Sequence, residues 1–176
     1  MSGGFERVGS RTIFEGRIIT VREDHYRYDD GGEADREFVG HPGAVGIVAH
    51  DEEHVFLVRQ PREAVGIPDL LEIPAGKLDE EGEDPLATAR RELAEEIGKA
   101  AGHWEHLHSF FTSVGFCDEE VHVFLATGLS DVQPPEIEED ERIELVPWPL
   151  ADLDAAIDGC RDSKTLVGLL ELRRRL

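Results

Sequence analysis

One helix is marked at both of its ends, and it constrains the fold more than any other feature of the chain. Asp84 is a typical N-cap residue, and Pro85 follows at the first helical position, where a missing N–H does no harm. Apolar residues then recur at spacings of three and four, at Leu86, Ala89, Leu93 and Ile97. Gly98 supplies the stop. The sequence therefore predicts a helix between Asp84 and Gly98 that buries one face.

Most of the remaining chain has the pattern of short strands. Residues 12–28 alternate apolar with polar side chains and end in a turn rich in Asp and Gly, which predicts an N-terminal hairpin completed by residues 36–39. Further strands are predicted at 44–49, 55–60, 71–73, 106–112, 120–126 and 142–148.

Two more helices are expected near the C-terminus. One begins at about residue 150 and breaks near Gly159, and the other spans Ser163 to Arg175. Strands interleaved with helices indicate an α/β or α+β sandwich.

Composition limits the possible partners. The 176 residues fit one domain of ordinary size, and 18 Lys and Arg against 39 Asp and Glu give a net charge of -21. Such a field repels nucleic acid and anionic membrane surfaces. The two cysteines are too few for a disulfide framework, residues 1–11 do not resemble a leader, and no apolar stretch approaches the ~20 residues that span a bilayer. We therefore expect a cytoplasmic protein.

The first helix carries a cluster of charges. Opposite its apolar stripe we expect four side chains: Arg91, Glu92, Glu95 and Glu96. Glu92 and Glu96 lie one turn apart, so their like charges oppose the helix unless water or a cation relieves them. One interpretation is a solvated face. The other is a divalent cation site, whose oxygen ligands leave room for water and substrate phosphates.

The residues before this helix favour the cation site. Together they form the pattern Gly76-x6-Glu83-x7-Arg91-Glu92-Leu93-x-Glu95-Glu96-x-Gly98. This pattern resembles the Nudix box of the Nudix hydrolases. Two departures stand out: the family has five residues in the first spacer, and an aliphatic residue at the position of Lys99.

The resemblance implies a fold, a metal and ligands. The fold is a Nudix-type α/β/α sandwich with a mixed sheet and an N-terminal antiparallel extension. Mg²⁺ or Mn²⁺ is the implied cofactor, and Arg91 forms a structural salt bridge with Glu83. The implied metal ligands are the carboxylates of Glu92, Glu95 and Glu96 and the carbonyl of Ala75.

Residues outside the box resemble the ADP-ribose pyrophosphatase branch, in the segments 36–45, 58–62 and 72–77. In that branch the arginines at Arg36 and Arg62 contact the ligand, and Glu37 helps to hold its adenine or ribose end. A guanidinium suits a pyrophosphate because it donates two parallel hydrogen bonds. The alternative is that both arginines merely pair with carboxylates.

The branch also implies an assembly. Residues 1–176 form one Nudix domain, with residues 1–40 as an N-terminal β extension that joins a homodimer and residues 41–176 as the core. The loop 110–119 is similar as well, but Val114 stands where proline is usual in ADP-ribose-specific members. A related ADP-sugar is therefore an alternative substrate.

A second acidic cluster spans residues 134–144. Alone it indicates a solvated loop. By resemblance it brings a general base and a further metal ligand to the site, and Glu139 and Glu141 are the best candidates, in that order. Glu95 is a second candidate for a catalytic role.

The resulting hypothesis is metal-dependent hydrolysis of the pyrophosphate bond in a nucleoside diphosphate derivative, with ADP-ribose giving AMP and ribose 5-phosphate. The alternatives are hydrolysis of another nucleotide sugar or of a nucleoside triphosphate, and a Nudix-fold sensor that binds a nucleotide without cleaving it. Retention of all three box glutamates favours an enzyme.

Overall fold

A computed structural model describes residues 3–78, 82, 84–133 and 142–176. The chain forms two compact units, one of residues 1–43 with 111–120 and one of residues 44–110 with 121–176. Within the described ranges, no helix is both long and apolar enough to span a bilayer.

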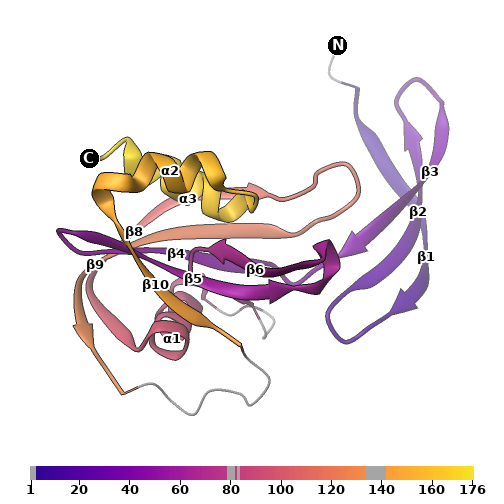
Figure 1. Cartoon of the computed structure of the whole chain (residues 1–176). Coiled ribbons are helices and arrows are strands. Elements are labelled where there is room, and N and C mark those ends of the chain that lie inside the picture. The colour runs from indigo at the N-terminus through magenta and orange to yellow at the C-terminus, as the bar shows by residue number, and fades with distance from the viewer. Residues whose placement is uncertain (1–2, 79–81, 83, 134–141) are drawn as a thin grey trace. The chain divides into compact units, whose positions relative to one another are not determined.

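The first unit contains a three-stranded antiparallel sheet in the order β1-β2-β3 (Figure 1). Its strands are β1 (Phe5–Glu15), β2 (Thr20–Tyr28) and β3 (Glu33–Gly40). The prediction of one strand over residues 12–28 is wrong, because the N–H of Gly16 donates to the carbonyl of Ile19 (2.9 Å) and closes a turn there. The alternation of apolar residues continues across this turn, so the pattern hides it.

The strand β1 is exposed along its whole length. Its large apolar side chains are about half exposed or more at three positions: Phe5 (69%), Ile13 (51%) and Phe14 (54%).

The second unit is built on a seven-stranded sheet with the path β10-β5-β4-β9-β8, with β6 beside β5 and β7 beside β4. The strands are β4 (Ala44–His50), β5 (His54–Arg62), β6 (Ile67–Glu72), β7 (Ala75–Lys77), β8 (Lys99–Phe111), β9 (Glu120–Asp131) and β10 (Glu144–Pro149). The β4–β9 pair is parallel and the β4–β5 pair is antiparallel, so the predicted mixed sheet is confirmed.

Most strands of this unit were expected, and two details differ. The β8 strand begins at Lys99, well before the predicted residue 106. The predicted strand 71–73 corresponds to the end of β6, which begins earlier, at Ile67, and stops at Glu72. After Ile73 and Pro74 the chain continues as β7, which pairs with β4, whereas β6 pairs with β5.

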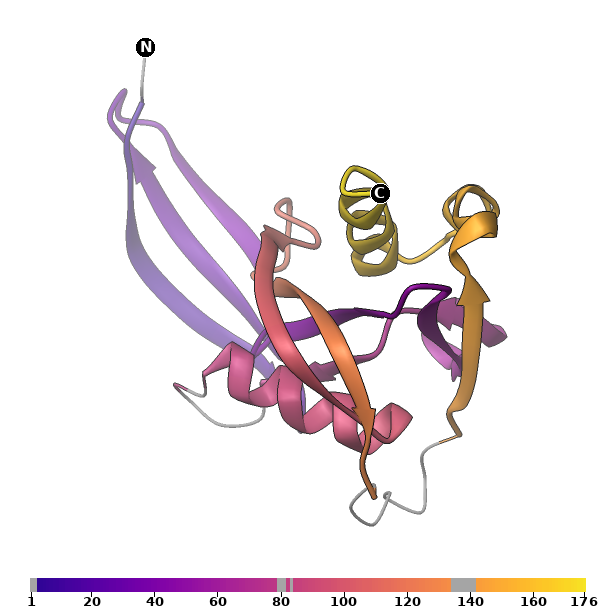
Figure 2. The ribbon, with the colours of Figure 1, turned by 90° about the vertical axis from the view of Figure 1, so that its left-hand side faces the viewer.

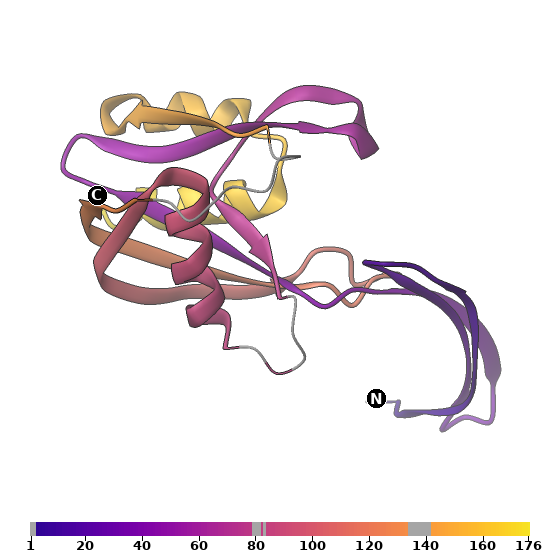
Figure 3. The same ribbon diagram turned by 90° about the horizontal axis from the view of Figure 1, so that it is seen from below.

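The helices cover both faces of this sheet, as Figures 2 and 3 show. They are α1 (Pro85–Ile97) on one face, and α2 (Leu153–Gly159) and α3 (Ser163–Arg173) on the other. Two short 3-10 turns lie at Glu63–Val65 and Leu150–Asp152. The predicted α/β/α sandwich is confirmed.

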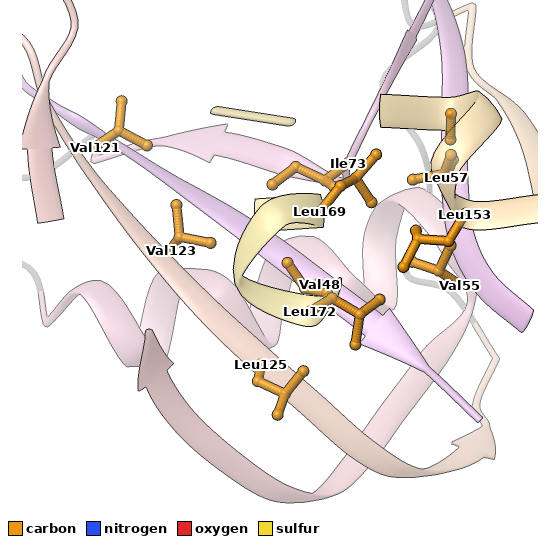
Figure 4. Close-up of a cluster of buried hydrophobic side chains, with 11 residues drawn as sticks. Val48, Val55, Leu57, Ile73, Val121, Val123, Leu125, Leu153, Leu169 and Leu172 are labelled. Carbon is orange, nitrogen blue, oxygen red and sulfur yellow. The ribbon is translucent and has the colours of Figure 1, made fainter. Parts of the chain in front are cut away.

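Alternation along the strands divides the apolar core in two. In β4, Val45 and Ile47 face α1, whereas Val48 faces α3. Figure 4 shows the cluster on the α3 side, where Leu169 and Leu172 pack over the sheet. Both helical layers therefore pack against the same strand, β4, one on each face of the sheet.

Candidate active site

The helix α1 has the ends that the sequence predicts. The carboxylate of Asp84 accepts a hydrogen bond from the N–H of Leu86 (3.3 Å), and a proline occupies the first turn. Gly98 closes the helix in the left-handed conformation (φ 63), which a side chain disfavours. Lys99 opens β8 and pairs with Asp131 (2.9 Å), so the departure from the family pattern at Lys99 leaves the helix end intact.

Glu92 lies on the buried side of α1, so its predicted place opposite the apolar stripe is wrong. The residue is 9% exposed, and Thr88, one turn before it, is fully buried. The backbone of Gly76 packs against the Glu92 carboxyl group so closely that a β-carbon there would collide with it. Arg91 pairs with the same carboxylate (2.9 Å). A solvated face therefore does not describe Glu92.

The other two box carboxylates have different partners. Glu96 accepts a hydrogen bond from the main-chain N–H of Ala75 (2.9 Å), which ties α1 to the start of β7. Glu95 pairs with Arg91 across one helical turn (2.7 Å). The strand β7 thus contacts α1 at two neighbouring residues, Ala75 and Gly76.

These residues fit a hard divalent cation. Their donors are carboxylate oxygens, and the Glu92 carboxyl group occupies the position that a side chain at residue 76 would take. Among the described residues no three acidic, His or Cys side chains already converge as a metal centre. Mg²⁺ does not require that, since it commonly takes one or two carboxylates together with water and substrate phosphates. Glu92 and Glu96 satisfy this requirement.

Arg62, at the end of β5, makes a two-pronged pair with Glu72. Its Nε donates to one carboxylate oxygen (2.6 Å) and its Nη2 to the other (2.8 Å). Glu72 is fully buried, whereas 40% of the Arg62 side chain is exposed. The Glu72 hydrogen bonds raise the pKa of Arg62 above its usual value, and the carboxylates of Asp162 and Glu96 act in the same direction. Of the α1 carboxylates, Glu96 is the one that contributes to this shift.

Glu72 has a second cationic partner, Lys164 in the first turn of α3. Lys164 also pairs with the helix-capping Asp162 (2.9 Å), which accepts hydrogen bonds from the N–H and hydroxyl groups of Thr165. Burial alone raises the pKa of Asp162, but the charge of Lys164 and the Thr165 hydrogen bonds outweigh it and keep this pKa below its usual value. The Thr165 hydroxyl in turn accepts from the N–H of Ile73 (2.9 Å).

A cavity of about 380 Å³ opens beside this network. Its lining includes Arg62, Glu72, Arg161, Asp162 and Ser163. The volume lies within the range of small-molecule sites, about 300 to 1,000 Å³.

Arg36 and Glu37 belong to the first unit. Arg36 donates to the carbonyl of Asp35 (2.9 Å) and to the hydroxyl of Tyr28 (3.4 Å), whereas Glu37 lies opposite Glu23 on β2. As neighbours in a strand, Arg36 and Glu37 point to opposite faces of the sheet. Their roles toward a ligand stay predictions.

Three predicted positions lie outside the described residues. They are Glu83, the expected partner of Arg91, and the two candidates of the second acidic cluster, Glu139 and Glu141.

Sequence reasoning missed Glu72 and Lys164. A signal was present, because Glu72 is a charged residue in the apolar run 70–73, and a carboxylate there requires a cationic partner. Its partner was not apparent, since Lys164 is 92 residues away in sequence.

Comparison with known proteins agrees with this geometry. The NUDIX domain family matches residues 40–165, and the nucleoside diphosphate sugar hydrolase N-terminal domain matches residues 5–39. The chain therefore belongs to the Nudix family, and it is a Nudix hydrolase.

Individual relatives are similar over most of the chain. An ADP-ribose pyrophosphatase of Mycobacterium tuberculosis is 44% identical over 84% of this chain and 72% of the relative. Another of Bacillus subtilis is 38% identical over 96% of this chain and 94% of the relative. A crystal structure of an ADP compounds hydrolase shares the fold, with a TM-score of 0.85 at 22% identity over 98% of this chain and 94% of that one.

Proposed function

We propose that this Nudix hydrolase cleaves the pyrophosphate bond of ADP-ribose and releases AMP and ribose 5-phosphate. The observation that carries this proposal is the arrangement around residues 72–76. There Glu96 of α1 accepts a hydrogen bond from the N–H of Ala75 in β7, and three residues earlier in the chain Glu72 holds the Arg62 fork. Carboxylates for a cation beside a guanidinium for an oxyanion suit a diphosphate. The names of the two similar pyrophosphatases support the choice of ADP-ribose.

Glu92, Glu95 and Glu96, with the carbonyl of Ala75 and with Glu141, would hold Mg²⁺ or Mn²⁺. Such a cation, when bound, neutralises diphosphate charge and lowers the pKa of a bound water. The net charge of -21 supports this requirement, because a dianionic substrate is otherwise repelled.

The remaining roles fall to side chains of the chain itself. Glu139 accepts the proton of the attacking water, with Glu95 as the alternative base. Arg36 and Arg62 bind the diphosphate, and Glu37 holds the adenine or ribose end. Metal titrations of Glu139→Gln and Glu141→Gln separate base from ligand, since excess metal restores turnover only where a ligand was weakened.

We further propose a cytoplasmic homodimer without a nucleic-acid or membrane partner. Residues 1–40 form the associating extension and residues 41–176 the catalytic core. The exposed apolar side chains of β1 support association, and the low cysteine content supports the compartment.

A related ADP-sugar is the second candidate substrate, because Val114 stands where proline is usual in ADP-ribose-specific members. A panel of ADP-ribose, other ADP-sugars, GDP-mannose, ATP and dGTP with Mg²⁺, with products separated by chromatography, tests the proposal. We expect the highest kcat/KM for ADP-ribose. A triphosphate that outperforms every diphosphate derivative refutes the substrate, and binding without turnover of any compound favours a sensor.

A further inference from the structure

Among the ion pairs that the structure describes in the second unit, Glu72 is the most buried carboxylate, and it pairs with two cations. Its side chain is 1% exposed, and Arg62 and Lys164 reach it from different elements, β5 and α3. Burial of a carboxylate is expensive unless the geometry of its partners is good. Apolar residues could fill the same space without loss of stability, so stability alone does not explain this ion pair.

The direction of the Arg62 guanidinium supplies one. Glu72 engages the edge formed by Nε and Nη2, which leaves the edge formed by Nη1 and Nη2 facing away from Glu72. Arg62 is 40% exposed and lines the cavity of about 380 Å³. The second edge is the pair of donors that matches two oxygens of a phosphate.

Lys164 holds Glu72 from the other side. The Lys164 side chain is 13% exposed and bridges Glu72 to Asp162, which caps α3. Two cations and two carboxylates give this group no net charge. Both oxygens of Glu72 are engaged, Oε1 by Arg62 and Oε2 by Arg62 and Lys164, and these contacts fix the orientation of the carboxylate.

The same segment reaches the metal-binding residues. Three residues after Glu72, the N–H of Ala75 donates to Glu96, and between them the N–H of Ile73 donates to Thr165 on α3. The backbone that carries Glu72 is thus fixed at both ends, by α3 and by α1.

We propose that Glu72 and Lys164 are positioning residues, which hold the guanidinium of Arg62 so that its outer edge is presented to the substrate diphosphate. This inference rests on the proposed function. A long flexible side chain that is ordered before the ligand arrives loses less entropy on binding. The expected signature is a change in substrate affinity, with the chemical step left nearly unchanged.

Steady-state kinetics with ADP-ribose and saturating Mg²⁺ test this signature. Glu72→Gln is expected to raise KM about tenfold and Lys164→Met about threefold, with kcat within about threefold of the parent. Asp154→Asn is the matched control, because Arg173 grips Asp154 by the same two nitrogens (2.8 and 3.2 Å) on an exposed surface. It is expected to leave both constants unchanged.

A double-mutant cycle separates positioning from general structural support. In an Arg62→Ala background, Glu72→Gln and Lys164→Met are expected to raise KM no further, because both act through Arg62. Effects that simply add overturn the inference. If Glu72→Gln does not fold, the Lys164→Met cycle decides alone. A parent that cleaves no ADP-ribose refutes the proposed function, whereas an active parent with additive effects refutes only the positioning role.

Discussion

Asp24 in the first unit and Glu72 in the second are both fully buried carboxylates that pair with arginine. Asp24 accepts hydrogen bonds from Ser10 (2.5 Å) on β1 and from Arg22 (3.0 Å) on its own strand β2. Burial alone raises the pKa of Asp24, but these hydrogen bonds outweigh it and keep this pKa below its usual value. Glu72 instead takes its cations from β5 and α3, which are separate layers of the sandwich.

The two sites differ in the further contacts of the arginine that pairs with the buried carboxylate. Arg22 donates again to Asp118 (3.3 Å), so both of its ends serve the first unit. Within the described part of the chain, Arg62 pairs with no second carboxylate, and it lines a cavity together with Arg161 and Ser163. Asp24 and Glu72 thus share burial and pairing with arginine, and they differ in whether that arginine also binds a second carboxylate or lines a cavity. Substitutions can separate the two.

The largest effect is expected at α1. Glu92→Gln or Glu96→Gln should lower turnover at least about 100-fold, since each removes a carboxylate from the proposed cation site. The melting temperature of the metal-free protein should fall in Glu92→Gln, because the change removes the ion pair between a buried carboxylate and Arg91. It should change less in Glu96→Gln, because the amide oxygen can still accept the hydrogen bond from the N–H of Ala75. Kinetics and calorimetry check this. Full activity in both variants would remove the cation site from this helix.

Asp24→Asn should show the reverse profile. Removing the charge from a buried, arginine-paired group is expected to lower the free energy of unfolding by about 2 to 3 kcal/mol. Turnover per folded molecule should stay within about twofold. Urea unfolding and kinetics measure the two effects, with Glu23→Gln as the control on the same strand, where the carboxylate is only half-buried and pairs with Arg11. Lost turnover with unchanged stability would show that Asp24 acts in function and not in folding, and Asp24 would then not differ from Glu72 in the way described above.

The same contrast shows where sequence reasoning succeeds. The ends of α1 follow local rules at Asp84 and Gly98, so they could be predicted from single residues. The pattern from Gly76 to Gly98 indicated the family, because it too lies within one short segment of the chain. The exposure of Glu92 could not be read from the helix alone, since it depends on Gly76 lying against the carboxyl group.

Contacts between residues far apart in the sequence could not be predicted from these local rules. The partner of Glu72 is on α3, and the crossing at Ile73 and Pro74 depends on how the sheet divides between β4 and β5. The turn at Gly16 also escaped, because the alternation on either side of it is continuous. These features are set by tertiary packing, which periodicity does not record.

A smaller effect is expected at Gly76, where the site depends on an absent side chain. Gly76→Ala should displace the Glu92 carboxylate and lower turnover about tenfold. The free energy of unfolding should fall by about 1 to 3 kcal/mol, as overpacking usually causes. Gly159→Ala is the control, because a β-carbon there meets nothing within 4 Å. Parent-like kinetics in Gly76→Ala would show that Glu92 has room to move without loss.

The smallest effect is expected at Asp162, the second carboxylate that pairs with Lys164. The folded-state pKa of Asp162 lies below the ~3.9 of a free aspartate, so its ionised form stabilises the fold above about pH 4. That stabilisation is lost as the pH falls through the folded-state value. Asp162→Asn should therefore be less stable than the parent by about 0.5 to 1 kcal/mol at pH 7, and the gap should close in acid. Urea unfolding at both pH values measures the gap. A gap that stays constant would mean that the Asp162 charge does not stabilise α3, and Lys164 would then be held by Glu72 alone.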